Sequence, residues 1–193
     1  TTANGSANPG YGLALVTPDT GASLAMPANA MVRNGGPNAA ITSMSSDNDS
    51  LYVTGYVFGS GGNLEGTSRI NWSDGSLTWV EDCHGDTYGN YVMGDVVYTV
   101  SHAHYCGNLE DGFGQTAPTW TFHWGNAFSK AVTGTLKADP LGYANWIGTP
   151  APSLQKWVPN LASGTYTGQS QAGWSVAGND SYVVLGGEFP RAG

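Results

Sequence analysis

Short apolar runs separated by polar turns occur along the whole chain, and three of these runs share one composition. They cover residues 51–58, 96–101 and 181–189, and each is rich in Tyr and Val, which favour β-strands. A turn that contains Asp or Asn precedes each run. The pattern predicts three copies of one unit, in which a polar turn leads into a Tyr- and Val-rich strand.

The spacing of these strands indicates a repeat. Tyr52 and Tyr98 are 46 residues apart, and Tyr98 and Tyr182 are 84 residues apart, which is two steps of 42. A period of about 40–45 residues is typical of a four-stranded propeller blade. Hairpin signals at 13–24 and 68–77, each with a turn that contains Asp and Gly, accompany the Tyr- and Val-rich strands, as expected for blades.

The strand at 51–58 is apolar on both faces, since Leu51 and Val53 alternate with Tyr52 and Tyr56. Stacked blades cover both faces of each sheet, whereas a sandwich, the alternative, leaves one face wet. We therefore expect an all-β, β-propeller-like fold of about four blades of four-stranded antiparallel sheet, in a single region over 1–193. Propellers usually have more blades, so we expect a fragment of a larger propeller whose partner is the remainder of its own longer chain.

Composition and charge favour a turn-rich protein that does not bind nucleic acid. Charged residues make up 10% of the chain and Gly contributes 29 residues, which disfavours long amphipathic helices. The net charge is −8 and the six Lys and Arg are scattered, which argues against binding to nucleic acid or anionic membranes. No run approaches the roughly 20 apolar residues of a membrane span, so we expect no membrane insertion.

The two cysteines, Cys83 and Cys106, point to export. In a chain poor in Lys and rich in Thr and Asn, a disulfide formed in an oxidising compartment is the favoured interpretation. Two free thiols or a shared metal ion are the alternatives. The chain begins with Thr1, which predicts either a removed leader or a piece of a longer protein.

Histidines lie beside both cysteines and suggest a metal site. His102 and His104 share one side of a strand, because strand side chains repeat every two residues. A disulfide would bring His84 and Asp86 close to them. Three imidazoles and one carboxylate suit Zn²⁺, and an open position on the ion can activate water. The alternative is that the disulfide staples two strands while the histidines bond to backbone carbonyls.

Three further sets of polar residues are candidates for chemistry. The Asp-Asn-Asp segment at 47–49 has the oxygen-rich composition of a Ca²⁺ loop, but it lacks the spaced carboxylates of an EF-hand, which favours a plain turn. Glu81, Asp82 and Glu188 are carboxylates for a glycosidase pair, although their spacing selects no pair. His123 is isolated and is expected to be structural. The sequence contains no nucleophile elbow, phosphate loop or dinucleotide fingerprint.

The segment 107–156 breaks the repeat and is rich in Trp and Pro, so we expect loops with short strands. Aromatic residues on loops can form a binding surface, and glycans are the expected ligands because sugar faces stack on exposed Trp and Tyr. The alternative is that these side chains pack between blades. The candidates in and just after this segment are Trp120, Trp124, Trp146 and Trp157.

Several segments resemble a known group of proteins. Leu-Tyr-Val-Thr-Gly-Tyr-Val-Phe-Gly at 51–59, Cys-His-Gly-Asp-Thr-Tyr at 83–88 and Val-Val-Leu-Gly-Gly-Glu-Phe-Pro at 183–190 resemble parts of large secreted actinobacterial proteins. Those proteins combine a β-propeller-like region with polycystic-kidney-disease, fibronectin or laminin-G-type modules. The resemblance extends from about residue 13 onward. It implies an exported bacterial protein of the cell surface or matrix, and it supplies no catalytic residue.

These observations predict a secreted, non-catalytic extracellular binding or scaffold module, with a glycan or another cell-surface component as its partner. One alternative is a metal-dependent hydrolase that uses His84, Asp86, His102 and His104, with Zn²⁺ or Ca²⁺ as the candidate cofactor. Another is a structural repeat of a surface layer or filament.

Overall fold

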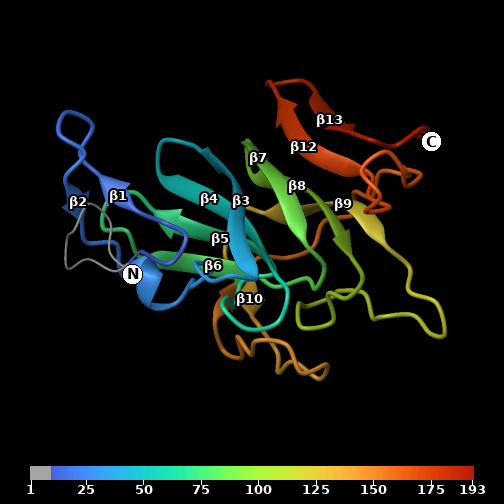
Figure 1. Cartoon of the computed structure of the whole chain (residues 1–193), viewed down its shortest axis with the longest axis horizontal. Coiled ribbons are helices and arrows are strands. Elements are labelled where there is room, and N and C mark those ends of the chain that lie inside the picture. The colour runs from blue at the N-terminus through green and yellow to red at the C-terminus, as the bar shows by residue number, and fades with distance from the viewer. Residues whose placement is uncertain (1–9) are drawn as a thin grey trace.

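The computed structural model describes residues 10–193, and it is built almost entirely of strands and loops (Figure 1). Within this range the strands form several small antiparallel sheets, none of which closes on itself. The all-β class is therefore confirmed. One turn of 3-10 helix, η1 (Pro27–Ala30), interrupts the strands. No helix in the described range is long and apolar enough to cross a membrane.

Three sheets make up most of the structure, and they follow one another in chain order (Figure 1). The first has the strand order β3 (Ala39–Ser46), β4 (Ser50–Val57), β5 (Gly66–Asn71) and β6 (Leu77–Glu81). The second contains β7 (Thr87–Met93), β8 (Val96–Ala103) and β9 (His123–Ser129). The third contains β12 (Gly173–Gly178) and β13 (Val183–Gly187).

Two short strand pairs complete the described sheets. β1 (Leu15–Val16) pairs with β2 (Ser23–Leu24), and β10 (Gly134–Thr135) pairs with β11 (Pro150–Ala151). The hairpin signals at 13–24 and 68–77 correspond to β1–β2 and to β5–β6.

The three Tyr- and Val-rich runs coincide with β4, β8 and β13, and each of these is the second strand of an antiparallel hairpin. The first strands of the same hairpins are β3, β7 and β12. β7 lies in contact with both β3 and β12 (Figure 1). The first strands of the three hairpins are therefore linked through β7.

Two of these hairpins turn in the same way. The backbone N–H of Asp47 donates to Ser50 O at 3.0 Å, and that of Asn179 donates to Tyr182 O at 2.9 Å. In each turn the side-chain Oδ1 of the first residue accepts bonds from the backbone N–H groups two and three residues later. The side chains of Asp and Asn thus close these turns with the same set of bonds.

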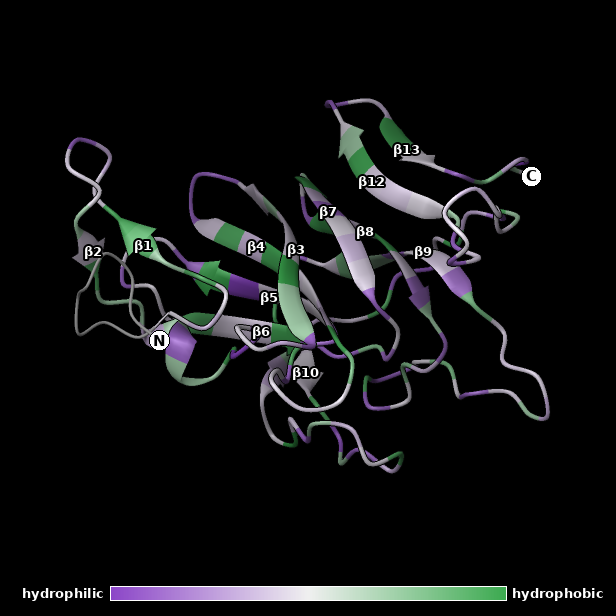
Figure 2. Cartoon of the chain, in the orientation of Figure 1, coloured by the Kyte–Doolittle hydropathy of each residue, from purple (hydrophilic) through white to green (hydrophobic). Residues whose placement is uncertain are grey.

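β4 is covered on both faces, as its two apolar faces predict. Leu51 and Val53 belong to the main core, whereas Tyr52 packs on the opposite side with Trp79 and with Val97 of the next sheet. The ring centroids of Tyr52 and Trp79 are 6.1 Å apart. In Figure 2 hydrophobic positions recur along β3, β4 and β6, so neighbouring sheets hide apolar surface from water against one another.

Side-chain hydrogen bonds join the first two sheets along β3 and β7. Thr42 Oγ1 donates to Thr87 O at 2.6 Å, and the hydroxyl of Ser45 bonds to Asn90 Oδ1. Both pairs join residues that are 45 positions apart in the sequence. Neighbouring sheets are thus held in one register by polar as well as apolar contacts.

A charged contact also links the two sheets. Lys130, just after β9, places its Nζ atom 2.6 Å from Asp47 Oδ2, and Tyr52 donates its hydroxyl to the same oxygen at 3.0 Å. Burial opposes the ionisation of Asp47, but Lys130 and the backbone donors of the turn outweigh it and lower its pKa to about 2.

We predict that Asp47→Asn lowers the free energy of unfolding at pH 7 by about 1 kcal/mol, the scale of a partly exposed ion pair. Asn retains the turn, as Asn179 demonstrates, and removes only the charge. Because the pKa of Asp47 is lowered from 3.8 to about 2, its stabilisation is complete above about pH 4 and is lost as the pH falls towards 2.

Urea denaturation of both proteins between pH 2 and pH 7 measures this effect. The difference in the free energy of unfolding between them should disappear towards pH 2. A Lys130→Met/Asp47→Asn double variant should lose no more stability than the less stable of the two single variants, Lys130→Met and Asp47→Asn. A difference that does not change with pH would show that the charge of Asp47 contributes nothing.

Candidate functional site

The ends of the first two sheets meet at the Cys83–Cys106 disulfide, which confirms the predicted bond. The two Cα atoms lie 4.3 Å apart. Next to it, His84 and Tyr105 form an isolated antiparallel bridge, and the backbone N–H of His104 donates to His84 O at 2.8 Å. The disulfide and this bridge hold the segment after β6 against the end of β8.

Gly85 permits this close approach. Its φ of +121° lies in the region that other residues rarely adopt, and a Cβ at this position would lie 2.4 Å from His102 O. Any larger residue would strain the backbone or push the two segments apart. Gly85 therefore fixes the position of His84 on one side of it and Asp86 on the other.

A pocket of about 480 Å³ opens beside the junction. Three of its polar lining residues, Glu65, Asp82 and His84, come from the segments that flank β5 and β6. Tyr143 and its neighbours in the loop 137–148 close the other side. We call this the acidic pocket.

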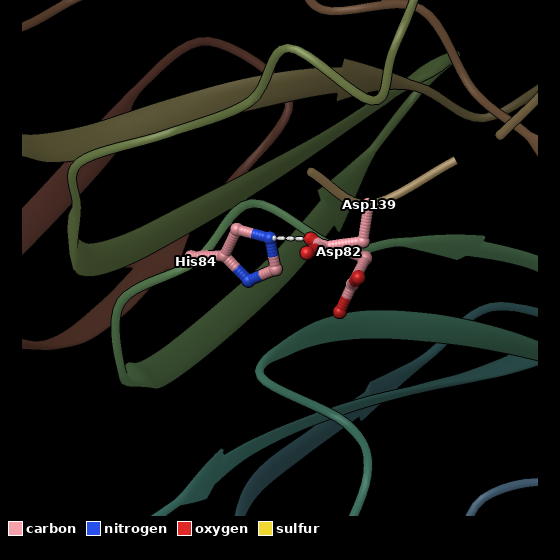
Figure 3. Close-up of side chains that lie close together, drawn as sticks. All are labelled: Asp82, His84 and Asp139. Carbon is pink, nitrogen blue, oxygen red and sulfur yellow. Dashed lines mark hydrogen bonds and ion pairs between the residues drawn. The ribbon is translucent and has the colours of Figure 1, made fainter. Parts of the chain in front are cut away.

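Asp139 anchors that loop beside His84. Its Oδ1 accepts hydrogen bonds from the backbone N–H groups of Leu141, Gly142 and Tyr143 at 2.7, 2.9 and 3.2 Å. Its Oδ2 contacts Nε2 of His84, and both side chains are buried. Figure 3 shows the edge of the His84 ring facing the carboxyl groups of Asp82 and Asp139.

The carboxyl groups of this region are crowded and poorly neutralised. Burial, followed by repulsion from Glu81, Glu65 and Asp139, raises the pKa of Asp82 well above its ordinary value. Burial also raises the pKa of Glu81 to about 7. Among residues 10–193, no Lys or Arg pairs with these groups, because Lys130 and Lys137 form their ion pairs elsewhere.

Asp139 differs from its neighbours. Burial opposes its ionisation, but the backbone donors of Leu141 and Tyr143 and the contact with His84 prevail and lower its pKa. It is therefore ionised at neutral pH and presents a negative charge to the buried face of His84.

His84 lies between two tyrosine rings. The ring of Tyr143 stacks on it at a centroid distance of 4.0 Å, and that of Tyr105 at 5.1 Å. The side chain is fully buried, and its Nδ1 has no hydrogen-bond partner. The nearest acidic atom to Nδ1 is Glu65 Oε2, which is 3.8 Å away and also lacks a hydrogen-bond partner.

Three aromatic residues follow one another at alternate positions before and within β9. Trp120 and Phe122 are 44% and 39% exposed, and Trp124 is half-buried. Their ring centroids are separated by 6.3 Å and 5.4 Å along the series. We call Trp120, Phe122 and Trp124 the aromatic strip.

His104 connects the aromatic strip to the acidic pocket. Its ring stacks under Trp120 at 4.2 Å with an interplanar angle of 24°, and lies 6.4 Å from the ring of His84. Burial lowers the pKa of His104, so the ring is neutral at pH 7. The rings of His84 and His104 therefore link the acidic pocket to Trp120 of the aromatic strip.

The structure separates the four residues of the expected metal site. His84 and His104 are neighbours, but His102 is occupied elsewhere, where it accepts from the backbone N–H of Asp86 at 3.2 Å and bonds to Gln171 at 3.0 Å. In the described range, the group of three His or acidic side chains whose ligand atoms all lie within 4.8 Å of one another is Asp82, His84 and Asp139. Only His84 belongs to both sets.

The four Trp residues expected to bind ligands also have different surroundings. Trp120 and Trp124 belong to the aromatic strip. Trp146 is buried in the main core, where it donates its indole N–H to Asn63 O at 2.8 Å. Trp157 packs edge-on against Tyr98 at 5.0 Å. Packing therefore accounts for Trp146 and Trp157.

The remaining candidates have structural partners. Both carboxylate oxygens of Asp47 are used by the turn, Tyr52 and Lys130, as expected of a plain turn. His123 stacks on Phe113 at 3.7 Å, and Glu188 accepts two hydrogen bonds from Thr167 at 2.8 Å.

Several residues of this region escaped the sequence analysis. Phe122 could have been found from its alternation with Trp120 and Trp124. Glu65 and Asp139 carry no local signal, since Asp139 lies 55 positions from His84 in an irregular loop. Asp82 is a candidate glycosidase carboxylate in the sequence, and its place in this cluster depends on that distant loop.

We predict that replacing both cysteines with Ser lowers the free energy of unfolding by about 3 kcal/mol, because the bond closes a loop of 23 residues in the unfolded chain. Guanidinium unfolding of the double variant and of the native protein measures the loss. Adding a reductant should lower the stability of the native protein to that of the variant and leave the variant unchanged. Equal stabilities without reductant would contradict the prediction.

Comparisons of the chain with family models, with curated proteins and with solved structures found no match. The function is therefore argued from the geometry of the acidic pocket and the aromatic strip.

Proposed function

We propose that this chain is a secreted, non-catalytic binding module of a bacterial cell-surface protein, and that it binds a neutral glycan on the aromatic strip. The observation that carries the proposal is the exposure of Trp120 and Phe122, at 44% and 39%, in a series of rings that continues to Trp124. Large aromatic side chains held on the surface in a series are typical of binding sites.

The chemistry of a sugar suits both parts of this region. The C–H face of a pyranose ring stacks on an aromatic ring, while its hydroxyl groups donate to carboxylates. Glu65 lines the neighbouring pocket. A chain with a net charge of −8 would repel anionic polysaccharides, which favours a neutral glycan.

The aromatic strip is held in place before any ligand arrives. His104 supports Trp120 from beneath. The Thr116 hydroxyl donates to Thr119 O at 2.7 Å and accepts from the backbone N–H of Thr121 at 2.8 Å, which ties the loop on either side of Trp120. A site that is ordered in advance loses less conformational entropy on binding.

The proposed scaffold is a set of propeller-like repeats. In support, β3, β7 and β12 open successive hairpins, and β7 lies in contact with the other two. Tyr91 of β7 donates its hydroxyl to Gly178 O of β12 at 2.8 Å, so the second and third sheets are joined by side-chain bonds, as the first and second are. The matching turns at Asp47 and Asn179 support the same interpretation.

Export and a surface location are supported by chemistry and by resemblance. A disulfide persists in oxidising compartments and is rare in the cytosol. The segments at 51–59, 83–88 and 183–190 resemble large secreted actinobacterial proteins. We therefore place the module outside a bacterial cell, on its surface or in its matrix.

We predict that Trp120→Ala weakens glycan binding about tenfold or more, since the stacking of a flat ring on an aromatic side chain contributes about 1–3 kcal/mol in nucleic-acid complexes. Isothermal titration with cellohexaose, xylohexaose, mannohexaose and chitohexaose would identify the ligand and give its affinity. Phe122→Ala should weaken the same interaction to a smaller extent.

Trp72→Ala is the matched control, because Trp72 is also 44% exposed and lies beside a different pocket. It should bind as the native protein does. No binding by the folded native protein to any of these oligosaccharides, or an equal loss in the Trp72 and Trp120 variants, would refute the proposal.

A further inference from the structure

We propose that Asp82, His84 and Asp139 bind one divalent transition-metal ion, for which Zn²⁺ is the best match. This inference does not rest on the glycan proposal, since its ligands are Asp82, His84 and Asp139 and the glycan proposal is carried by the aromatic strip. It also differs from the metal site expected from the sequence, because only His84 is common to both.

The three side chains converge from two distant parts of the chain. Asp82 and His84 flank Cys83 after β6, whereas Asp139 comes from the loop 137–148. One ligand atom from each lies within 4.8 Å of the other two. Figure 3 shows the ring edge of His84 turned towards both carboxyl groups.

The carboxylates are already oriented by hydrogen bonds, as metal ligands usually are. Asn108 donates its side-chain N–H to Asp82 Oδ2 at 3.3 Å. Three backbone N–H groups hold Asp139 Oδ1, which leaves Oδ2 directed at His84. Both carboxyl groups are therefore held near His84 by hydrogen bonds from other parts of the chain.

An independent observation concerns the far side of His84. Its ring is fully buried, yet Nδ1 has no hydrogen-bond partner, and Glu65 Oε2 at 3.8 Å has none either. Buried polar atoms normally have hydrogen-bond partners, so the lack of a partner at both His84 Nδ1 and Glu65 Oε2 needs an explanation. When a metal-ligating His binds the ion through one nitrogen, it donates the other N–H to a carboxylate. Glu65 is placed to accept that bond.

The local charge points to a cation. Asp82 and Glu65 are buried, Asp139 has a buried side chain, and no Lys or Arg of residues 10–193 forms an ion pair with any of them. Buried charges in proteins are usually paired or bind a metal ion. Among residues 10–193, His84 is the basic side chain that forms ion-pair contacts with this group, and a divalent ion would neutralise the excess.

The donor set selects the kind of ion. Ca²⁺ and Mg²⁺ prefer ligands that are all oxygen, whereas imidazole nitrogen combined with carboxylates suits Zn²⁺ and its neighbours in the first transition row. Thiolate ligands are excluded in the oxidised protein, since Cys83 and Cys106 are bonded to each other.

The test measures Zn²⁺ binding directly. Protein freed of metal by a chelator and gel-filtered with excess ZnCl₂ should retain about one Zn²⁺ per chain by elemental analysis. His84→Gln and Asp139→Asn should each lower the affinity by at least about tenfold, since even outer-sphere partners of metal ligands contribute 10–100-fold. His123→Gln is the matched control, because His123 stacks on Phe113 outside the cluster, and it should bind Zn²⁺ normally.

Co²⁺ added to the native protein provides a readout that needs no variant. It should produce visible d–d absorption that equimolar Zn²⁺ removes and that a large excess of Ca²⁺ does not. The Co²⁺ measurement tests the metal site even if His84→Gln fails to fold. Because no glycan is present, an absence of Co²⁺ binding leaves the glycan proposal standing.

Three results would overturn the inference. They are retention of far less than one Zn²⁺ per chain, Zn²⁺ affinity that is unchanged in folded His84→Gln and Asp139→Asn, and an equal loss of affinity in His123→Gln.

Discussion

The cross-link between Cys83 and Cys106 is the constraint on which both functional surfaces depend. It holds the exit of the first sheet against the exit of the second, and the bridge between His84 and Tyr105 continues the contact by one residue on each side. His84 then faces the acidic pocket, and His104 supports Trp120 of the aromatic strip. Two surfaces of different chemistry are therefore positioned by one junction.

The rest of the structure satisfies a simple requirement of its composition. β4 carries apolar side chains on both faces, so its sheet must pack on its neighbours to remove both faces from water. Tyr52, Trp79 and Val97 fill the space between the first two sheets, and hydroxyl and amide side chains bond across β3 and β7. Lys130 links the first two sheets, and within the described residues no Lys or Arg forms an ion pair with the acidic pocket.

Local patterns were sufficient to predict β4, β8, β13 and the disulfide. The runs at 51–58, 96–101 and 181–189 are rich in residues that favour strands, and their turns contain the Asp and Asn side chains that close them. The composition predicted the Cys83–Cys106 bond, since the chain has two cysteines, few Lys and many Thr and Asn.

The site could be predicted only in part, because it depends on segments without periodicity. Strand alternation alone did not show that His102 would bond to Asp86 and Gln171 and leave His84 to face Asp139. Asp139 enters from an irregular loop 55 positions away, which no local pattern places. The exposure of Trp120 and the burial of Trp146 likewise follow from tertiary contacts rather than from residue type.

The central claim is that the disulfide junction organises the acidic pocket and the support of the aromatic strip. Hydrogen–deuterium exchange of the native protein before and after reduction of Cys83–Cys106 tests it most directly, because amide protection reports local opening. Exchange should rise most in residues 82–88, 102–109 and 137–146, and less in β3 and β4. An equal rise in all segments, or unchanged protection around His84 and His104, would contradict the claim.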